Sequence, residues 1–404
     1  MTELTVLLYG TKVGVLHGEN RTFDFHPTAE AIERFGPGST QLSLALPLSV
    51  QQPRHLAKRR RNWFRELLPE GDFRTYLSNQ AGLIETETLG LLARYGRDVA
   101  GAVEILAEDQ SPTETPTLSP IDESTIREYL TKPLLAPLGN RPDEGKTSLA
   151  GVQPKVLLTR RKGRWHTAAG GAPSSHIVKP ELPAPRHSAI YDEEYGLRLA
   201  RRIGLLRYET SLHTFDSLGA LVIERYDREG LARVHQEDFS QILGASGVEK
   251  YQEYGSRVSL SRVAEAVTRH LPSPELAQLA TLVSFSVAIG NLDLHTKNIS
   301  VLHPQDLPAR LAPAYDSQPH AHQDDNDGRV ALSVGGEYRW KAITRQHLEA
   351  EFRSWGLRSP GTLIDTVADG LQAAVSEEAP DNRADPRMLP MVHTGIEKLR
   401  GHDA

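Results

Sequence analysis

The sequence contains no cysteine, which excludes disulfide bonds, thiolate chemistry and zinc sites built on thiolates. A long apolar run is also missing, because the longest one, Leu279 to Ile289, includes Thr and Ser and is too short to span a bilayer. The first residues lack the basic and apolar regions of a signal peptide. We therefore expect a cytoplasmic protein without a membrane segment.

Positive charge is not in excess, since 46 Lys and Arg stand against 52 Asp and Glu, a formal net charge of -6. This balance argues against a general nucleic-acid-binding protein, which needs a net basic surface, but it leaves a local basic patch open. The strongest basic run is Lys58 to Arg61. We interpret it first as a solvated helix face and second as a contact for DNA or an acidic partner.

The chain of 404 residues is long enough for two or three domains, or for one large two-lobed domain. Residues 4–16 predict a hairpin, residues 150–226 alternate strand-like runs with turns, and helical periodicity prevails from about residue 236. A Pro/Thr/Ser-rich stretch after residue 110 marks a boundary. We predict an N-terminal subdomain at 1–110, a linker at 111–122, the remainder of a mixed N-lobe at 123–235 and a helical C-lobe at 236–404.

The same periodicity predicts individual elements. The predicted helices are Arg54 to Leu68, Thr88 to Tyr95, Glu193 to Ile203, Ser261 to Leu271, Glu275 to Ile289, His347 to Trp355 and Thr362 to Ser376. The predicted strands after the hairpin are Val99 to Leu106, Lys155 to Thr159, Trp165 to Ala168, Ser175 to Lys179 and Ala220 to Arg225.

One segment carries polar residues at the spacing of a phosphotransferase catalytic loop. They are Asp293, His295, Lys297 and Asn298, in the pattern D-x-H-x-K-N, followed by Tyr315 and Asp316. Phosphoryl transfer uses one Asp to take the hydroxyl proton, an Asn five residues later to hold a metal ion, and a second Asp farther on to hold the metal ions at the phosphates. Asp293, Asn298 and Asp316 stand in that order. The segment therefore predicts the active centre of a kinase-like phosphotransferase.

Two segments before the strand at Lys155 concern phosphate binding. Ser148 to Lys155 contains small residues that let backbone N–H groups approach phosphate oxygens, although a plain turn between strands is the simpler interpretation. Gly139 to Thr147 ends in Gly-Lys-Thr and resembles a P-loop. A P-loop has four residues between its two glycines, whereas five stand here and include Pro142, so we disfavour that interpretation.

Other nucleotide contacts are predicted farther along. Lys179 ends an apolar strand, where a lysine commonly reaches the phosphates with the support of a helix glutamate, here Glu193 or Glu194. A solvent-facing lysine is the alternative. Residues 221–228 run from a strand into a charged connector, which fits either an adenine-binding hinge or a salt-bridged strand end. The acids within residues 235–239 are expected to cap the following helix.

Together these motifs resemble the HipA family, the serine/threonine kinase toxins of bacterial type II toxin–antitoxin modules. The resemblance covers nearly the whole chain and implies an α+β, protein-kinase-like two-lobed fold. That fold has an N-terminal β-rich subdomain, a mixed α/β nucleotide lobe and an all-helical C-terminal lobe. The motifs that carry the resemblance are Leu67 to Gly71, Tyr95 to Val103, Ser148 to Lys155, His176 to Pro180, Glu224 to Arg228, His235 to Phe239 and the D-x-H-x-K-N loop.

The resemblance implies ATP and Mg²⁺ as cofactors, with Asp293 as the catalytic base and Asn298 and Asp316 as the magnesium ligands. Lys179 resembles the lysine that binds the ATP phosphates. Ser148 matches the serine that the family autophosphorylates, and its new negative charge would expel the loop from the nucleotide site. Further ATP contacts are expected at Ala150, Gly151, Val152, Gln153, Lys155, Glu224, Tyr226, His295, Lys297 and Tyr315.

The family also implies partners: a small HipB-like helix-turn-helix antitoxin, operator DNA reached through that complex, and a protein substrate such as an aminoacyl-tRNA synthetase. The His- and Asp-rich run after Asp316 departs from the apolar continuation expected there. Two alternatives stay open. One is a small-molecule kinase, against which Ser148 and the N-terminal hairpin module argue. The other is a catalytically silent co-repressor that binds the antitoxin, against which the intact Asp293 and Lys179 argue.

Overall fold

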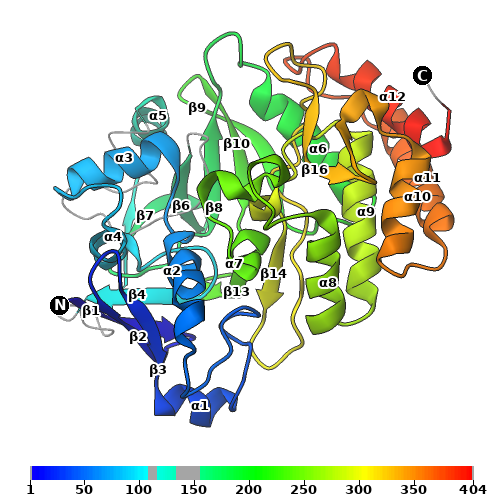
Figure 1. Ribbon diagram of the computed structural model, residues 1–404. Helices are drawn as coiled ribbons and strands as arrows, with labels where there is room; N and C mark the ends of the chain where they lie inside the picture. The colour runs from blue at the N-terminus through cyan, green and yellow to red at the C-terminus, as the bar shows by residue number, and fades with distance from the viewer. Residues whose placement is uncertain (1, 108–115, 133–154, 403–404) are drawn as a thin grey trace. The chain divides into compact units, whose positions relative to one another are not determined.

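The computed structural model describes residues 2–107, 116–132 and 155–402 (Figure 1). The chain forms two compact units, each assembled from three stretches of sequence. The first unit contains Met1–Pro180, His213–Gly247 and Leu302–Leu307, and the second contains Glu181–Leu212, Val248–Val301 and Pro308–Ala404. Ser148, the phosphate-loop residues 150–153 and the P-loop-like segment 139–147 lie outside the described residues.

The first unit begins with an antiparallel sheet in the order β3-β2-β1-β4. The predicted hairpin is confirmed, because β1 and β2 pair along their length and turn at Tyr9 and Gly10. The strands are β1 Thr2–Leu8, β2 Thr11–Gly18, β3 Asp24–Pro27 and β4 Val103–Ala107. The helices of this part are α1 Ala29–Phe35, α2 Ala57–Arg65, α3 Gly71–Gln80 and α4 Thr88–Tyr95, with a 3-10 turn at Arg54–Leu56 before α2.

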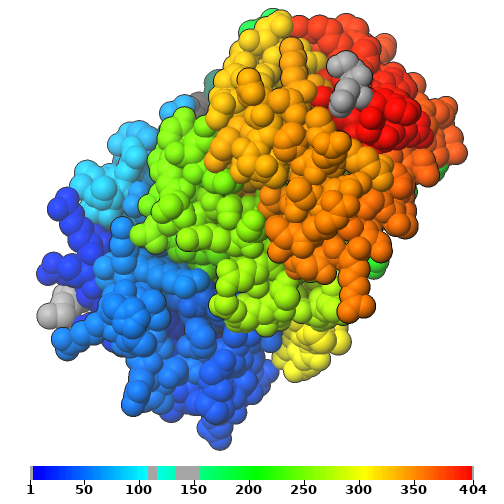
Figure 2. Space-filling view, turned by 45° about the vertical axis from the view of Figure 1, so that its right-hand side comes forward, coloured from blue at the N-terminus to red at the C-terminus, as the bar shows by residue number. Residues whose placement is uncertain are grey.

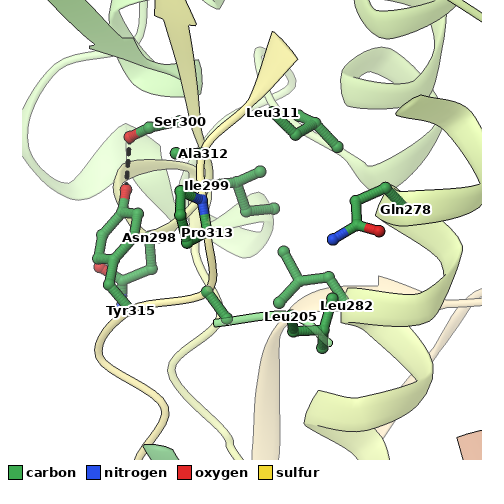
Figure 3. A pocket seen from close by; sticks show the side chains of 11 residues that line it. Leu205, Gln278, Leu282, Asn298, Ile299, Ser300, Leu311, Ala312, Pro313 and Tyr315 are labelled. Carbon is green, nitrogen blue, oxygen red and sulfur yellow. Dashed lines mark hydrogen bonds between the residues drawn. The ribbon is translucent and has the colours of Figure 1, made fainter. Parts of the chain in front are cut away.

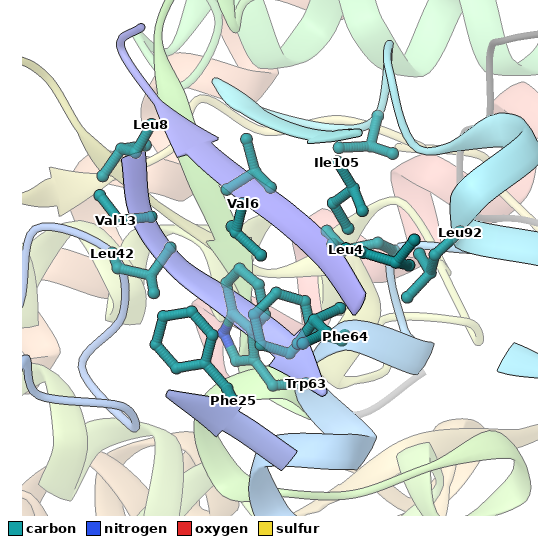
Figure 4. Close-up of a cluster of buried hydrophobic side chains, with 14 of the residues drawn as sticks. Leu4, Val6, Leu8, Val13, Phe25, Leu42, Trp63, Phe64, Leu92 and Ile105 are labelled. Carbon is teal, nitrogen blue, oxygen red and sulfur yellow. The ribbon is translucent and has the colours of Figure 1, made fainter. Parts of the chain in front are cut away.

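Alternation along β1 builds the core of this sheet. Leu4, Val6 and Leu8 lie on one face of the strand because successive side chains of a strand point to opposite faces. Figure 4 shows that face turned toward Trp63 and Phe64 of α2, and all five side chains are buried. The apolar face of α2 therefore fixes the helix on the sheet.

A six-stranded sheet in the order β5-β7-β6-β8-β10-β9 follows in the sequence (Figure 1). Its strands are β5 Thr117–Pro120, β6 Val156–Arg161, β7 Arg164–Ala169, β8 His176–Pro180, β9 Thr210–Phe215 and β10 Leu218–Glu224. Helix α5, Glu123–Thr131, contributes Ile126 and Leu130 to a buried cluster that also contains Val156 and Val178 of the sheet. Residues 117–120 fall in the predicted linker but pair with β7, so that part of the chain is an edge strand.

Shorter elements complete the first unit after β10. They are β11 Arg228–Glu229, β12 Ala232–Arg233, β13 His235–Asp238 and α7 Phe239–Leu243. The predicted strand from Val99 is wrong at its start, because residues 99–102 form a turn and β4 begins only at Val103.

The second unit is mainly helical, and its helices, α12 excepted, match the predicted ones to within a few residues. They are α6 Ala189–Arg202, α8 Leu260–His270, α9 Pro274–Ala288, α10 Arg345–Ser354, α11 Pro360–Glu377 and α12 Met388–Arg400. Figure 2 shows α10 and the C-terminal helices, in orange to red, gathered on the surface of this unit. Helix α12 was not predicted. It packs so closely on α9 that a Cβ on Gly395 would lie 1.9 Å from the carbonyl oxygen of Ala288.

The expectation that this region is all-helical is too simple, since it also contains short strands. They are β14 Ser300–His303, which continues into the first unit, β15 Arg310–Leu311, β16 Arg329–Val334 and β17 Glu337–Arg339. β16 and β17 form a hairpin whose turn residues, Gly335 and Gly336, both have positive φ. Such a Gly-Gly pair is a hairpin signal in the sequence. No helix among the described residues has the length and apolar character needed to cross a membrane.

Candidate active site

The predicted catalytic loop leaves the C-terminal end of α9 at Gly290. This residue has φ +64°, and a Cβ there would lie 2.4 Å from the sulfur of Met391. The left-handed backbone favours glycine here, and a Cβ would also crowd the Met391 side chain of α12. Asn291 N–H donates to the carbonyl of Ser286 at 2.9 Å, which fixes how the loop departs from the helix. A 3-10 turn, Thr296–Asn298, then leads into β14.

Asn291 joins the two predicted catalytic carboxylate residues through their backbone. Its side-chain oxygen accepts a hydrogen bond from Asp293 N–H at 2.9 Å, and its amide nitrogen approaches the carbonyl oxygen of Asp316 at 3.4 Å. Asn291 is itself buried. The structure thus brings Asp293 and Asp316 into one site and adds Asn291 to it. The sequence holds Asn291 two positions before Asp293, where an Asx-type bond to the backbone is a recognisable local signal.

Asp293 is the accessible carboxylate of an otherwise buried loop. Its side chain is 44% exposed, whereas His295 and Asn298 are buried. The Tyr251 hydroxyl donates to its Oδ1 at 3.0 Å, and His295 Nε2 lies 3.8 Å from its Oδ2. Asn298 Nδ2 donates to the Asp293 carbonyl at 2.9 Å. The carboxylate is therefore held in place yet open to a substrate, as a general base must be. No pattern in the sequence marks Tyr251 as its partner.

Asn298 and Asp316 are the predicted magnesium ligands, and both side chains carry the oxygen atoms that Mg²⁺ prefers. Mg²⁺ is usually held by one or two protein oxygen ligands together with phosphates and water, so two residues are enough. The bond from Asn298 Nδ2 to the Asp293 carbonyl uses the nitrogen of the amide and leaves its oxygen as the ligand atom. Asp316 has φ 51°, a left-handed conformation that Asp adopts more readily than most residues.

The residue after Asp316 is seated against helix α6. A Cβ on Gly196 would lie 1.9 Å from the carbonyl oxygen of Ser317, so the backbone can run there only because the helix carries glycine. The N–H groups of His320 and Ala321 both donate to the carbonyl of Gly290. The run that departs from the family pattern is thus bonded to the start of the catalytic loop.

His320 and His322 give this run a buried, polar anchor. Burial lowers the pKa of His320 to about 4, against the opposing effect of the Asp316 carboxylate. His322 is buried with its Nε2 3.4 Å from Asp192 Oδ2, and Asp192 Oδ1 accepts from the N–H of Asp385 at 2.8 Å. The approach of His322 to Asp192 gives that histidine a structural role.

Tyr315 connects the two loops of the site. Its hydroxyl donates to the carbonyl of Lys297 at 2.7 Å and lies 2.6 Å from Ser300 Oγ, as Figure 3 shows for the serine. Together with Asn298 it borders a cavity of about 10 Å³ closed by Leu205 and other apolar side chains. That volume suits a single water molecule and no nucleotide. The observed contacts of Tyr315 are therefore structural ones.

The predicted phosphate-binding lysines lie in the first unit. Lys179 is 4% exposed on β8, a middle strand, so the alternative of a solvent-facing lysine is wrong. Lys155 is also buried, just before β6. Of the proposed partners, Glu194 forms an ion pair with Arg198 on its own helix at 2.8 Å. Glu193, like Glu194, belongs to the second unit.

The predicted hinge, Glu224 to Tyr226, leads from β10 into a buried cluster of charges. Arg225 binds the carboxylate of Asp227 through Nε at 2.9 Å and through Nη2 at 2.8 Å. Asp98, from the turn before β4, accepts from Arg228 at 2.8 Å and from Arg233 at 2.6 Å. All of these groups except Arg233 are fully enclosed. One of the two interpretations from the sequence was a strand end with salt bridges. These salt bridges are present, and they are buried.

This charged cluster ties the N-terminal part of the chain to both sides of the hinge. Gly101 N–H donates to Asp227 Oδ2 at 2.7 Å, next to the arginine pairs of Asp98. Burial alone would raise the pKa of Asp227, but Arg225 and Arg228 lower it to about 2. The arginines likewise hold the pKa of Asp98 far below its usual value against burial. Both carboxylates are therefore ionised at neutral pH.

The acids before α7 have two different roles. Asp238 caps the helix as expected: its Oδ1 accepts from Gln241 N–H at 2.8 Å, and Gln241 Oε1 accepts from Asp238 N–H at 3.0 Å. Glu237 is not a cap. Its buried carboxylate accepts from donors of four residues: Ser43 Oγ at 2.6 Å, Leu44 N–H at 2.7 Å, Trp63 Nε1 at 2.8 Å and His303 Nε2 at 3.0 Å.

The basic run Lys58 to Arg61 is not a solvated face throughout. Arg60 is 2% exposed, and its guanidinium forms two hydrogen bonds to the carboxylate of Asp24, at 2.5 and 2.6 Å. Arg59 donates to the carbonyl of Ile242. Within the run, only Lys58 is exposed. The preferred interpretation was wrong at Arg60 because its partner lies in a different strand, beyond what local periodicity can show.

Comparisons with known proteins place these features in a family. The model of the HipA-like C-terminal domain matches residues 147–378, and the model of the HipA N-terminal domain matches residues 4–106. The chain belongs to the HipA family. The first match takes in the catalytic loop and the hinge, and the second takes in the hairpin module and Asp98. The expected family resemblance is therefore confirmed.

Relatives of the chain are named as kinases. A Sinorhizobium fredii protein named "Putative kinase Y4mE" is 33% identical over 331 residues, 76% of this chain and 75% of the relative. The serine/threonine-protein kinase toxin HipA of Shewanella oneidensis is 27% identical over 310 residues, 72% of this chain and 70% of that protein.

A solved structure confirms the predicted α+β kinase-like fold of the family. It is the Shewanella oneidensis HipA of a complex with HipB and operator DNA. The two chains superpose with a TM-score of 0.78 at 23% identity, over 99% of this chain and 96% of that one.

Proposed function

We propose that the chain is a HipA-like toxin that acts as a Mg-ATP-dependent serine/threonine protein kinase. The observation that carries the proposal is the arrangement around Asn291. That side chain bonds to the backbone of both Asp293 and Asp316, while Asn298 bonds to the Asp293 carbonyl. A kinase needs these three residue types together, and the relatives named as kinases support the same activity.

In the proposed reaction a substrate hydroxyl attacks the γ-phosphorus of ATP. A new P–O bond forms, the bond to the ADP oxygen breaks, and Asp293 accepts the hydroxyl proton. Asn298 and Asp316 hold Mg²⁺, which neutralises charge on the phosphates when bound. His295 and Lys297, which belong to the catalytic loop, contact the nucleotide. Tyr315 positions that loop.

The proposal assigns the remaining nucleotide contacts to the residues predicted from the sequence. Lys179 binds the phosphates, and Lys155 closes a phosphate loop that includes Ala150, Gly151, Val152 and Gln153. Glu224 and Tyr226 present the backbone that binds adenine. The hydrogen bond between the Tyr226 hydroxyl and Gln236 Oε1 holds that hinge residue in place.

We further propose that the kinase autophosphorylates Ser148 and thereby silences itself. The phosphate would add nearly two negative charges beside the ATP phosphates and repel them. We propose a HipB-like antitoxin as partner, operator DNA reached through that complex, and an aminoacyl-tRNA synthetase as the class of protein substrate in the cytoplasm. The Shewanella oneidensis complex of HipA, HipB and operator DNA supports the first two partners.

Intact mass spectrometry before and after incubation with Mg-ATP tests the kinase proposal. We expect added phosphate that peptide mapping places on Ser148, and none in Asp293→Ala. Asp369→Ala, an exposed substitution on α11, is the matched control and should gain phosphate as the parent does. Transfer by Asp293→Ala would contradict the assignment of the base. A parent that starts without phosphate, gains none and binds ATP would instead be a silent co-repressor.

A further inference from the structure

The hairpin formed by β6 and β7 carries a second basic run, which ends in an exposed tip. Residues 160–164 read Arg-Arg-Lys-Gly-Arg, and all five are exposed. Thr159 pairs with His166, Arg160 with Trp165, and Arg161 with Arg164. Directly paired residues share a face of the hairpin, so Arg161 and Arg164 lie on one face and Arg160 lies on the other. Lys162 projects from the turn between them.

Two features of this tip cost folding free energy. Lys162 has φ 49° and Gly163 has φ 76°, the pattern of a turn that favours Asn-Gly. An ordinary side chain in the left-handed region costs about 1 kcal/mol or more, and Asn costs less. Arg161 and Arg164 also stand directly opposite each other, and like charges in that position repel. Neither feature improves the isolated fold, which points to a role in binding.

Three cations of the tip have no counter-charge among the residues that the structure describes. The side chains of Arg161, Lys162 and Arg164 form no hydrogen bond or ion pair with any other residue in the described ranges. Arg160 instead lies over the ring of Trp165, 5.4 Å from its centre. These cations are concentrated on a chain whose overall formal charge is -6.

The root of the hairpin is rigid. Trp165 packs edge-on against His176 at 5.2 Å and Phe215 at 5.9 Å between ring centres, and its backbone carbonyl accepts a hydrogen bond from Ile121. Figure 1 shows β6 and β7 side by side within the larger sheet, with β5 on the other side of β7 in the strand order. The basic tip is therefore the two-stranded end of strands that are held in the larger sheet, beyond the residues that pair with β5 and β8.

We propose that the tip of the β6–β7 hairpin binds the phosphate backbone of duplex DNA. The major groove of B-form DNA admits a two-stranded ribbon, and phosphates then face the ribbon from both sides. Cations on both faces and at the turn suit that setting, whereas an acidic protein surface would meet one face. The major groove of double-stranded RNA is too deep and narrow for such an entry. The contact goes beyond the proposed kinase function and does not depend on phosphoryl transfer.

The test is fluorescence anisotropy with the full chain, a labelled mixed-sequence DNA duplex, and salt from about 50 mM to about 200 mM. The key variant is Lys162→Asn. It removes one charge and places the residue that the turn prefers, so the hairpin should be at least as stable as in the parent. Lys341→Asn is the matched control, because it makes the same change at an exposed lysine of the second unit.

We expect Lys162→Asn to weaken DNA binding about tenfold at about 50 mM salt and to reduce the slope of log affinity against log salt by about 1. The double variant Arg161→Gln/Arg164→Gln should reduce that slope by about 2. Lys341→Asn should bind as the parent does. Parent-like affinity in both hairpin variants, or no binding by the parent at low salt, would overturn the proposal. Tighter binding of an RNA duplex than of the DNA duplex would also overturn it.

Discussion

Glu237 and Asp238 are adjacent acids for which the structure predicts very different contributions to stability. Glu237→Ala removes the carboxylate that accepts from Ser43, Leu44, Trp63 and His303, at distances of 2.6 to 3.0 Å. The site is fully buried, so water cannot replace the lost acceptor. Burial would raise the pKa of Glu237, but hydrogen bonds from His303, Ser43 and Trp63 lower it below its usual value. The carboxylate is therefore charged in the folded protein.

Breaking a buried charged site from one side costs about 3 to 5 kcal/mol, because the remaining donors stay buried without an acceptor. Asp238→Ala removes a helix cap and costs about 1 kcal/mol. We expect urea denaturation, followed by tryptophan fluorescence, to show a difference of at least about 2 kcal/mol between the two variants. A cost for Glu237→Ala no greater than that for Asp238→Ala would refute the reasoning. Glu237→Gln, which keeps one oxygen, should fall between them.

Two further predictions concern the charged hinge cluster and the catalytic loop. The folded pKa of Asp98 is depressed, so its stabilising effect is present above the unfolded value of about 3.9 and is lost as pH falls below it. Thermal melts should therefore show Asp98→Asn destabilised at pH 7 with a weaker acid dependence than the parent; parallel pH profiles would contradict this. Asn291→Ala removes the bonds to Asp293 and Asp316, together worth about 1 to 3 kcal/mol, so autophosphorylation should slow about 5- to 150-fold. Asn291→Asp, which keeps the acceptor for Asp293 N–H, should lose less, and a parent-like rate in Asn291→Ala would remove Asn291 from the site.

The sequence predicted well those features that depend on neighbours along the chain. The hairpin at Tyr9 and Gly10 and the helices that were predicted in the second unit have a period or a turn signal of their own. The catalytic loop is also local, since the bond from Asn298 to Asp293 spans five residues. For the same reason the Asp238 cap was foreseen, because its partner is three residues away.

Features that depend on distant partners could not be predicted in this way. Arg60 is buried because Asp24, 36 positions earlier, receives its guanidinium. Glu237 and Ser43 are separated by 194 positions, so nothing near Glu237 marks it as an interior acceptor. Tyr251 reaches Asp293 across 42 positions. A single sequence shows the residue types at such sites but not which of them meet.

The cluster around Asp98 also bears on how members of this family can exchange parts. The match to the N-terminal family model ends at residue 106, and the match to the C-terminal model begins at residue 147. This division suggests two modules that could be recombined freely. The hydrogen bonds from Arg228 to Asp98 and from Gly101 N–H to Asp227 cross that division within one compact unit. In a chimera with a foreign N-terminal module, the residue at the position of Asp98 would come from one protein and its arginine partners from another. The turn before β4 and the strand end after β10 should therefore be inherited, and engineered, as one block.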